Sequence, residues 1–114
     1  MSEQTITTGE LVSAFLEACG VQTAFGVVSI HNLPMLDAIG RRGKIRFVPS
    51  RGEAGAVNMA DGYARATGKP AAVLVTSGPG AGNTVTGLMT AQMDSVPMIV
   101  LTGQQVLWLS LIHI

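Results

Sequence analysis

The feature of this sequence that most constrains its fold is the alternation of short apolar runs with segments of helical periodicity. The apolar runs are Thr23–Val28, Lys69–Val75 and Val96–Leu101, and a further strand is predicted at Lys44–Val48, where apolar and polar residues alternate before Pro49. Strands that are apolar along most of their length are typical of a parallel sheet covered by helices on both sides. We therefore predict an α/β fold: a doubly wound, mainly parallel sheet with helices on both faces.

A helix is predicted before the first strand. It opens with Thr7 and Glu10 at capping-box spacing, in which each side chain satisfies a free backbone N–H, and Gly20 is expected to end it. One apolar stripe at helical spacing should face the core, which makes Cys19 an interior apolar residue. The stripe consists of Val12, Phe15, Leu16 and Cys19.

Three further helices are predicted between the strands. The first covers Pro34–Ile39 and ends at Gly40. The second covers residues 53–66, with small residues and one aromatic on one side: Ala56, Ala60, Tyr63 and Ala64. The third covers residues 81–93, with these residues at helical spacing: Val85, Leu88, Met89 and Gln92.

Composition excludes several classes of protein. Seven Lys and Arg balance seven Asp and Glu, whereas a nucleic-acid-binding protein normally carries a basic excess. A hydrophobic share of 47% argues against intrinsic disorder. The single cysteine allows no intramolecular disulfide, and the amino terminus does not resemble a signal peptide, so a cytoplasmic location is predicted. No apolar stretch approaches the length of a membrane span, so no membrane partner is expected.

In a doubly wound fold, ligands bind beyond the carboxyl ends of the strands, where loops lead into helices. The candidate turns lie near residues 26–33, 49–53, 76–83 and 102–105. No group of Cys, His and carboxylate residues has the spacing of metal ligands, so no metal site is predicted in this chain. Asp61, Arg65 and Asp94 are expected to be surface charges or local ion pairs.

The glycine-rich loop Thr76–Asn83 follows a predicted strand and opens a helix. Its glycines would let the backbone approach a ligand, and free N–H groups at a helix start attract anions. The match to a dinucleotide-binding loop is incomplete, because Asn83 stands where a third glycine is expected and Pro79 lacks an N–H. A tight strand-to-helix turn explains the same residues, so both interpretations stay open at this point.

Two further residues have both a structural and a functional interpretation. Ser50 and Glu53 match a capping box, yet Glu53 lies at the predicted crevice among small neighbours, which suits a carboxylate that handles protons. His31 is the only histidine outside the tail of the chain and lies in the first candidate loop. It is either a structural loop residue or part of the site.

Several motifs in one order resemble a known family. They are Arg51–Glu53, Ala60–Gly68, Val75–Gly80, and Asp94–Pro97 followed by Thr102–Gln104. They resemble the N-terminal pyrimidine-binding domain of thiamine-diphosphate enzymes of the acetolactate synthase and benzoylformate decarboxylase group. The resemblance assigns residues 1–105 to part of such a domain.

The resemblance implies a role for Glu53: its carboxyl group hydrogen-bonds N1′ of the cofactor aminopyrimidine, which activates the thiazolium C2 for attack on a 2-keto acid. It also implies that Gln104 lies near the substrate or an accessory flavin. His31 is placed in the same vicinity, as a replacement for the histidine that many members carry where this chain has Gly52. The residues implied to line the pyrimidine site, besides Glu53, are Thr76, Ser77, Gly78, Pro79, Gly80 and Asn83.

For the whole enzyme, the resemblance implies a lyase or transferase that decarboxylates or joins 2-keto acids, as a homodimer or homotetramer. Magnesium would be bound by a C-terminal domain that this chain does not contain, so the chain alone is expected to be inactive. A requirement for FAD stays undecided. The hydrophobic tail, residues 106–114, departs from the family pattern, and an artefactual origin is one explanation for it. The alternative function is a non-catalytic α/β module that binds a nucleotide or a partner through Gly78–Asn83.

Overall fold

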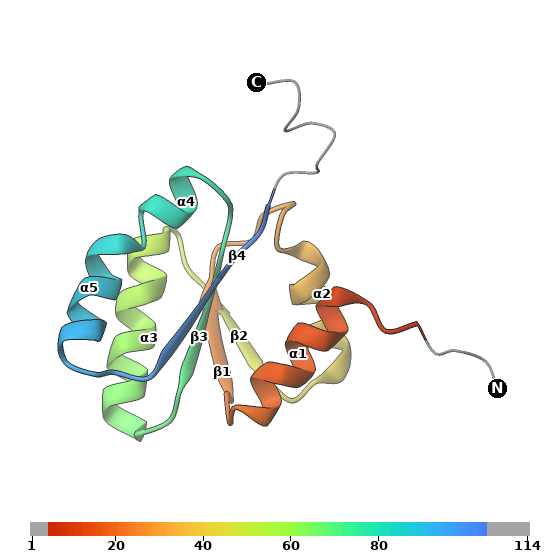
Figure 1. Cartoon of the computed structure of the whole chain (residues 1–114), viewed down its shortest axis with the longest axis horizontal. Helices are drawn as coiled ribbons and strands as arrows, with labels where there is room; N and C mark the ends of the chain where they lie inside the picture. Colours follow the sequence, from red (N-terminus) through yellow and green to blue (C-terminus); the bar gives the residue numbers. More distant parts are fainter. Residues whose placement is uncertain (1–4, 105–114) are drawn as a thin grey trace.

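The structure, a computed structural model, describes residues 5–104, in which helices and strands alternate along the chain (Figure 1). The strands are β1 (Thr23–Gly26), β2 (Arg46–Pro49), β3 (Ala71–Val75) and β4 (Met98–Thr102). The helices are α1 (Thr8–Ala18), α2 (Leu33–Arg42), α3 (Glu53–Thr67), α4 (Pro79–Gly82) and α5 (Val85–Met93). The predicted tail, residues 106–114, lies outside the described residues.

The four strands form one sheet in the order β2-β1-β3-β4, and every pair is parallel. Ala24 of β1 pairs with Phe47 of β2 on one side and with Ala72 of β3 on the other. Ala72 in turn pairs with Ile99 of β4. The carboxyl ends of all four strands therefore meet at one edge of the sheet, which we call the carboxyl edge.

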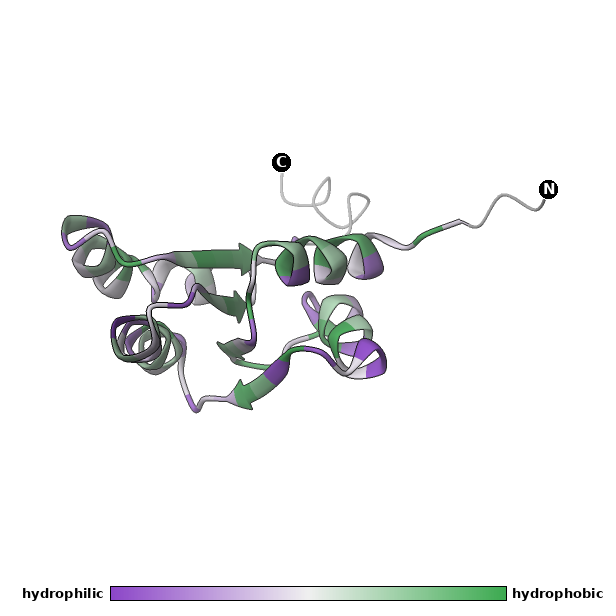
Figure 2. Cartoon of the chain, turned by 90° about the horizontal axis from the view of Figure 1, so that it is seen from below, coloured by the Kyte–Doolittle hydropathy of each residue, from purple (hydrophilic) through white to green (hydrophobic). Residues whose placement is uncertain are grey.

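Helices cover both faces of this sheet (Figure 2). Helices α1 and α2 lie against one face, and α3 and α5 lie against the other. Each face buries its own apolar cluster. The first cluster is Leu16, Val21, Ala24, Ile39, Ile45, Ala72 and Leu74, and the second is Phe25, Ala56, Val57, Ala60, Ala71, Val73 and Val75. This arrangement confirms the predicted doubly wound parallel sheet.

The central and edge strands differ in burial. All five residues of β3 are buried, because helices cover both of its faces and strands flank both of its edges. The edge strand β2 is half-buried or exposed, and it ends with Pro49, which an edge strand tolerates because its N–H is not needed for sheet pairing. The other edge strand, β4, is half-buried from Met98 to Leu101.

The capping box of α1 is confirmed, and the predicted buried face is right for Leu16 and Val12 but wrong for Phe15 and Cys19. Thr7 accepts a hydrogen bond from the backbone of Glu10, whose carboxylate accepts one in return. Phe15 and Cys19, however, are exposed. The fully buried residues of α1 are Gly9, Ser13 and Leu16. A Cβ at Gly9 would clash with the carbonyl oxygen of Pro34, so α1 meets α2 closely at this glycine.

Helix α2 is longer than predicted. It passes through Gly40 and ends at Arg42, followed by the capping residue Gly43, whose φ of 65° is the left-handed conformation that glycine adopts readily. Arg41 and Arg42 form its last turn, and both are ion-paired, Arg41 with Asp37 and Arg42 with Glu17. Such cations are favourable at a helix carboxyl end, so the chain continues as helix where Gly40 alone suggested a stop.

Helix α3 matches its prediction closely. Ala56, Ala60 and Ala64 are buried, and Tyr63 packs edge-on against Phe25 of β1 with the ring centroids 5.8 Å apart. The small alanines let α3 lie close to the sheet. Arg65, on the outer side, pairs with Asp61 and with Asp94, as expected for surface charges.

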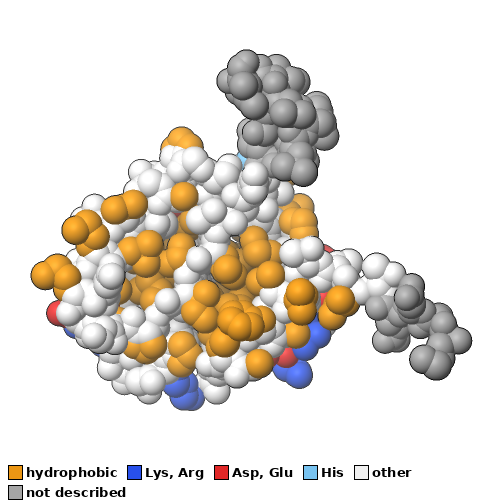
Figure 3. Space-filling model, in the orientation of Figure 1, with side chains coloured by type: hydrophobic (Ala, Val, Ile, Leu, Met, Phe, Trp, Pro, Cys, Tyr) orange, Lys and Arg blue, Asp and Glu red, His pale blue; other side chains and the backbone are white. Residues whose placement is uncertain are grey.

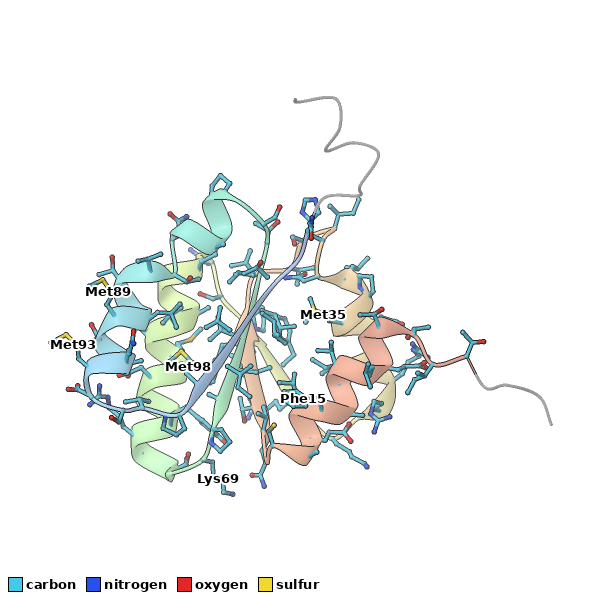
Figure 4. The ribbon with its side chains drawn as sticks, in the orientation of Figure 1. Phe15, Met35, Lys69, Met89, Met93 and Met98 are labelled. Atoms are coloured by element: carbon cyan, nitrogen blue, oxygen red, sulfur yellow. The ribbon has the colours of Figure 1, made fainter. Side chains whose placement is uncertain are left out.

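The predicted helix over residues 81–93 is in fact two helices, α4 and α5, separated at Asn83 and Thr84. The predicted face is also wrong, since Val85, Met89 and Gln92 are exposed and only Leu88 is half-buried. Met89 and Met93 point away from α3 (Figure 4). The buried residues of this segment are instead Thr84 and Ala91.

A close contact between α3 and α5 explains why α5 buries Ala91 and exposes Val85 and Met89. A Cβ at Gly87 would lie 2.6 Å from Cγ1 of Val57, so α5 meets α3 through this glycine. Gly87 and Ala91, four residues apart, therefore form the inner face, and the larger apolar residues point to solvent. Hydrophobic side chains also gather on the side of the molecule from which β4 is seen (Figure 3).

Candidate functional site

The order of the strands places a crevice between β1 and β3. Helix α2 connects β1 to β2 on one face of the sheet, whereas α4 and α5 connect β3 to β4 on the other face. The loops that leave β1 and β3 therefore diverge at the carboxyl edge. Such a switch point is where open α/β sheets bind their ligands.

Glu53 is the first residue of α3 and lies at this carboxyl edge. The capping-box interpretation of Ser50 and Glu53 is wrong, because the N-cap residue is Gly52 and no side chain caps the helix. Ser50 Oγ instead donates a hydrogen bond of 2.8 Å to the carbonyl oxygen of Gly52. The Glu53 carboxylate therefore has no capping role and is available to the crevice.

The glycine-rich loop approaches Glu53 directly. Asn83 Nδ2 donates a hydrogen bond of 3.2 Å to Glu53 Oε2. A Cβ placed on Gly80 would lie 3.2 Å from Glu53 Oε1 and would also clash with Cγ2 of Thr76. The structure thus brings together four of the predicted site residues, and glycine at position 80 leaves space beside the carboxylate.

The remaining residues of this loop set its shape. Gly78 has a φ of 59°, a conformation that a side chain disfavours, and it turns the chain into α4. Pro79 is the first residue of α4, so the helix begins with a residue that has no N–H. Helix α4 has only four residues. The short α4 is therefore poorly suited to binding a phosphate through free N–H groups. Ser77 and Thr76, which precede the loop, are half-buried at the end of β3.

His31 spans the crevice from the β1 side. Its Nδ1 lies 2.9 Å from Oγ1 of Thr76, so the imidazole is hydrogen-bonded to the end of β3. Gln104, the other residue predicted near a substrate, is exposed just after β4. Its neighbour Gly103 packs against the backbone and Cβ of His31. The loops after all four strands therefore contribute to one region.

Two residues that support this region were missed by sequence reasoning. The side chain of Asn32 is fully buried, donates 2.9 Å to the carbonyl of Val27 and accepts 2.9 Å from the N–H of Ser29. It fixes the loop that carries His31. The spacing of Ser29 and Asn32 around a turn is a signal of such a bond. Gly103 gave no signal in the sequence, because its role is a contact with a distant loop.

Residues 5–104 contain neither a candidate metal site nor a candidate membrane span. No group of three or more His, Cys, Asp or Glu side chains there could hold a metal ion. None of the helices in that range is both long and apolar enough to cross a membrane.

Comparison with known proteins defines the class to which this fold and site belong. Residues 6–112 match the family described as thiamine pyrophosphate enzyme, N-terminal TPP binding domain. The chain belongs to this family, as its motifs predicted.

The similar proteins include several acetolactate synthases. The chain is 48% identical over 99 residues to the mitochondrial acetolactate synthase catalytic subunit of Saccharomyces cerevisiae, covering 87% of this chain and 14% of that protein. It is equally similar to the acetolactate synthase large subunit of Haemophilus influenzae, of which it covers 17%. The Lactococcus lactis large subunit is 44% identical over 102 residues, covering 90% of this chain and 18% of that protein. The chain thus spans less than a fifth of the length of each of these relatives.

Proposed function

We propose that this chain is the part of an acetolactate synthase-like enzyme that binds and activates the aminopyrimidine of thiamine diphosphate. The observation that carries the proposal is the cluster of Glu53, Asn83, Gly80 and Thr76 at the switch point of the sheet. A half-buried carboxylate at the carboxyl edge, with a glycine as its close neighbour, suits a hydrogen bond to the edge of a flat heterocycle. The family match and the acetolactate synthase relatives support the same assignment.

In this proposal each side chain has a defined task. Glu53 accepts a hydrogen bond at the ring nitrogen of the aminopyrimidine and holds the proton there. Asn83 orients the carboxylate through the bond to Oε2, which leaves Oε1 directed toward Gly80. Thr76, Ser77, Gly78 and Pro79 line the same side. Thiamine diphosphate, when bound, supplies the carbon nucleophile that attacks a carbonyl group, and the protein supplies orientation and electrostatics.

We extend the proposal to the longer enzyme. It acts on 2-keto acids by decarboxylation, carboligation or both, as a lyase or transferase. It works as a homodimer or homotetramer in the cytoplasm, and its magnesium is held outside this chain. FAD, if the enzyme uses it, lies near Gln104. A nucleotide- or partner-binding module that uses Gly78–Asn83 has less support, because α4 is short and begins with Pro79.

The test is the exchange of the C2 proton of bound thiamine diphosphate with deuterium, measured in the longer enzyme. Glu53→Gln keeps the shape of the side chain but weakens its ability to hold the proton, so exchange should slow at least ~100-fold, as general acid–base catalysis leads one to expect. Glu10→Gln is the matched control: the Glu10 carboxylate contacts Thr7 and Arg41 at the start of α1, and glutamine also suits that capping position. Equal exchange in wild type and Glu53→Gln would overturn the proposed role of Glu53.

A further inference from the structure

We propose that Arg51 recruits the substrate to the crevice by attracting its carboxylate group; this inference rests on the proposed function. The loops that leave the four strands at the carboxyl edge are residues 27–32, 50–52, 76–78 and 103–104. Arg51 is the only Lys, Arg, Asp or Glu in these loops. The next charged residue, Glu53, begins α3 and is assigned to the cofactor. Arg51 is therefore the charge that remains for a substrate.

The other basic side chains lie elsewhere, and most of them have partners. Those in ion pairs with carboxylates are Arg41, Arg42, Lys44 and Arg65. Lys69 Nζ donates a hydrogen bond of 2.9 Å to Oε1 of Gln22, just before β1, and Arg46 is the first residue of β2. Arg51, by contrast, is exposed at the carboxyl edge and makes no ion pair or side-chain hydrogen bond with any of residues 5–104.

The backbone that carries Arg51 is held firmly. The N–H of Ser50 donates a hydrogen bond of 2.7 Å to the carbonyl oxygen of Gly26, and Ser50 Oγ donates one of 2.8 Å to that of Gly52. A Cβ at Gly55 would lie 2.9 Å from Ser50 Oγ, so the first turn of α3 packs against the same loop. A guanidinium on such a backbone suits a carboxylate, which it can bind through two parallel hydrogen bonds.

A 2-keto acid brings a negative charge into the crevice. Without Arg51, the nearest charged side chain in the sequence would be the Glu53 carboxylate, which repels a second carboxylate. The Cα atoms of residues 51 and 53 are at most about 7 Å apart, because two residues span no more than that. This is within the ~8 Å over which exposed charges interact in physiological salt. Arg51 also directly precedes the N-cap of α3, where the helix dipole adds a partial positive charge.

The anion that Arg51 attracts is the substrate carboxylate and not the diphosphate of the cofactor. In thiamine diphosphate, the aminopyrimidine and the diphosphate are attached to opposite sides of the thiazolium ring, and the carbon nucleophile belongs to that ring. Glu53 is assigned to the aminopyrimidine, so a cation two residues away lies at the pyrimidine end of the cofactor. The diphosphate, with magnesium, is assigned to a part of the enzyme outside this chain.

The main test is Arg51→Gln in the longer enzyme, with pyruvate as a simple 2-keto acid. The loss of the charge should lower kcat/KM for pyruvate ~10-fold, as expected for electrostatic recruitment. The effect should appear in KM, with kcat within about twofold of wild type, because recruitment does not act on the reaction step itself. Arg51→Lys keeps the charge without the fork geometry and should recover part of the loss.

Two controls separate recruitment from a structural effect. Arg46→Gln removes an equally exposed arginine at the amino end of β2 and should leave kcat/KM unchanged. Methyl pyruvate has the same carbonyl group as pyruvate but no charge, so its inhibition constant should be the same in wild type and Arg51→Gln. An unchanged kcat/KM for pyruvate, or an equal effect on methyl pyruvate, would overturn the inference. A loss confined to the affinity for thiamine diphosphate would overturn it too.

The dependence on salt tests the inference without any variant. In the wild-type enzyme, rising ionic strength should lower kcat/KM for pyruvate and leave the inhibition constant of methyl pyruvate unchanged. A kcat/KM for pyruvate that does not respond to salt contradicts the inference. Exchange of the cofactor C2 proton, measured without substrate, should be equal in wild type and Arg51→Gln, and slower exchange in the variant counts against recruitment. Absence of exchange in the wild-type enzyme is a different outcome, since it overturns the proposed function itself.

Discussion

At the scale of single residues, the site depends on the absence of a side chain at Gly80. A Cβ at Gly80 would clash with Thr76 Cγ2 and would lie 3.2 Å from Glu53 Oε1, a tight contact. The neighbouring Asn83 donates its hydrogen bond to the other carboxylate oxygen of Glu53. Glycine is therefore required here for space, and its φ is not in the left-handed region.

Gly80→Ala should lower the free energy of unfolding by about 1–3 kcal/mol, the usual effect of forcing a methyl group into a packed site. Urea unfolding of the chain, followed by circular dichroism, measures this. Gly82→Ala is the matched control, since a Cβ at Gly82 meets nothing within 4 Å, and it should change stability by no more than about 0.5 kcal/mol. Equal stability of the two variants would contradict the close packing of Gly80.

The candidate residues could be placed at the carboxyl edge of the sheet from the sequence, but their contacts could not be described. Glu53 could be placed at the carboxyl edge because it follows an apolar run, and its small neighbours indicated room for a ligand. The hydrogen bonds of Asn83 to Glu53 and of His31 to Thr76 could not be predicted. They join loops that are far apart in the sequence, and the distance between such loops depends on the packing of the whole domain.

At the scale of helices and strands, prediction succeeded for the strands, was partly right for the buried face of α1 and failed for that of α5. The apolar runs identified β1, β3 and β4, and the alternation of residues 44–48 before Pro49 identified the edge strand β2. The faces of α1 and α5 were assigned from their large apolar residues, yet Gly9 and Gly87 make the closest contacts. Where two helices meet at a glycine, that contact decides which face of the helix is buried. The periodicity of the apolar residues does not indicate where such contacts occur.

An ion pair connects the carboxyl ends of α1 and α2. Glu17 accepts hydrogen bonds of 2.6 and 2.8 Å from Arg42, and Lys44 lies 3.4 Å away. The hydrogen bond from Arg42 lowers the pKa of Glu17 to about 2, against an opposing effect of burial and with further help from Lys44. The charged form of Glu17 is thus favoured in the folded state.

The lowered pKa predicts how stability depends on pH. The unfolded chain binds the proton near the ordinary pKa of 4.5, and the folded chain only near 2, so the stabilisation is complete above pH 4.5 and is lost as pH falls toward 2. Glu17→Gln should therefore flatten the loss of unfolding free energy across this window, as measured by urea unfolding at a series of pH values. Asp94→Asn, which removes an exposed ion pair between the end of α5 and Arg65 of α3, provides the comparison. A wild-type slope retained in Glu17→Gln would refute this linkage.

At the scale of the whole molecule, one side carries much unshielded apolar surface. Strand β4 pairs only with β3 among the described residues, so its outer backbone groups form an open edge. Exposed apolar side chains flank it on both sides, including Phe15 of α1 and Met89 and Met93 of α5 (Figures 3 and 4). Open edges and contiguous apolar surface both favour association with another protein surface.

We therefore expect the 114-residue chain to self-associate in solution and to bind thiamine diphosphate and magnesium only weakly. Sedimentation velocity over a range of concentrations measures the first property. Met93→Lys should weaken association about tenfold, or ~1.4 kcal/mol, by placing a charge in the apolar surface. Gln92→Lys adds the same charge to an exposed polar position of α5 and should have little effect. A chain that stays monomeric at all concentrations, or binds the cofactor tightly, would contradict this expectation.

The central position of β1 also has a consequence for how the chain acquires its structure. β1 is the first strand to be synthesised, yet it needs both β2 and β3 as neighbours, and Ala24 cannot pair with Ala72 until β3 has left the ribosome. Strands that are distant in the sequence pair slowly, because the entropy cost of closing the loop between them must be met before their contacts stabilise the pair. During much of synthesis, Ala24 and Phe25 of the nascent chain are therefore exposed to solvent. We expect chaperones to engage this segment first and to release it when β3 emerges.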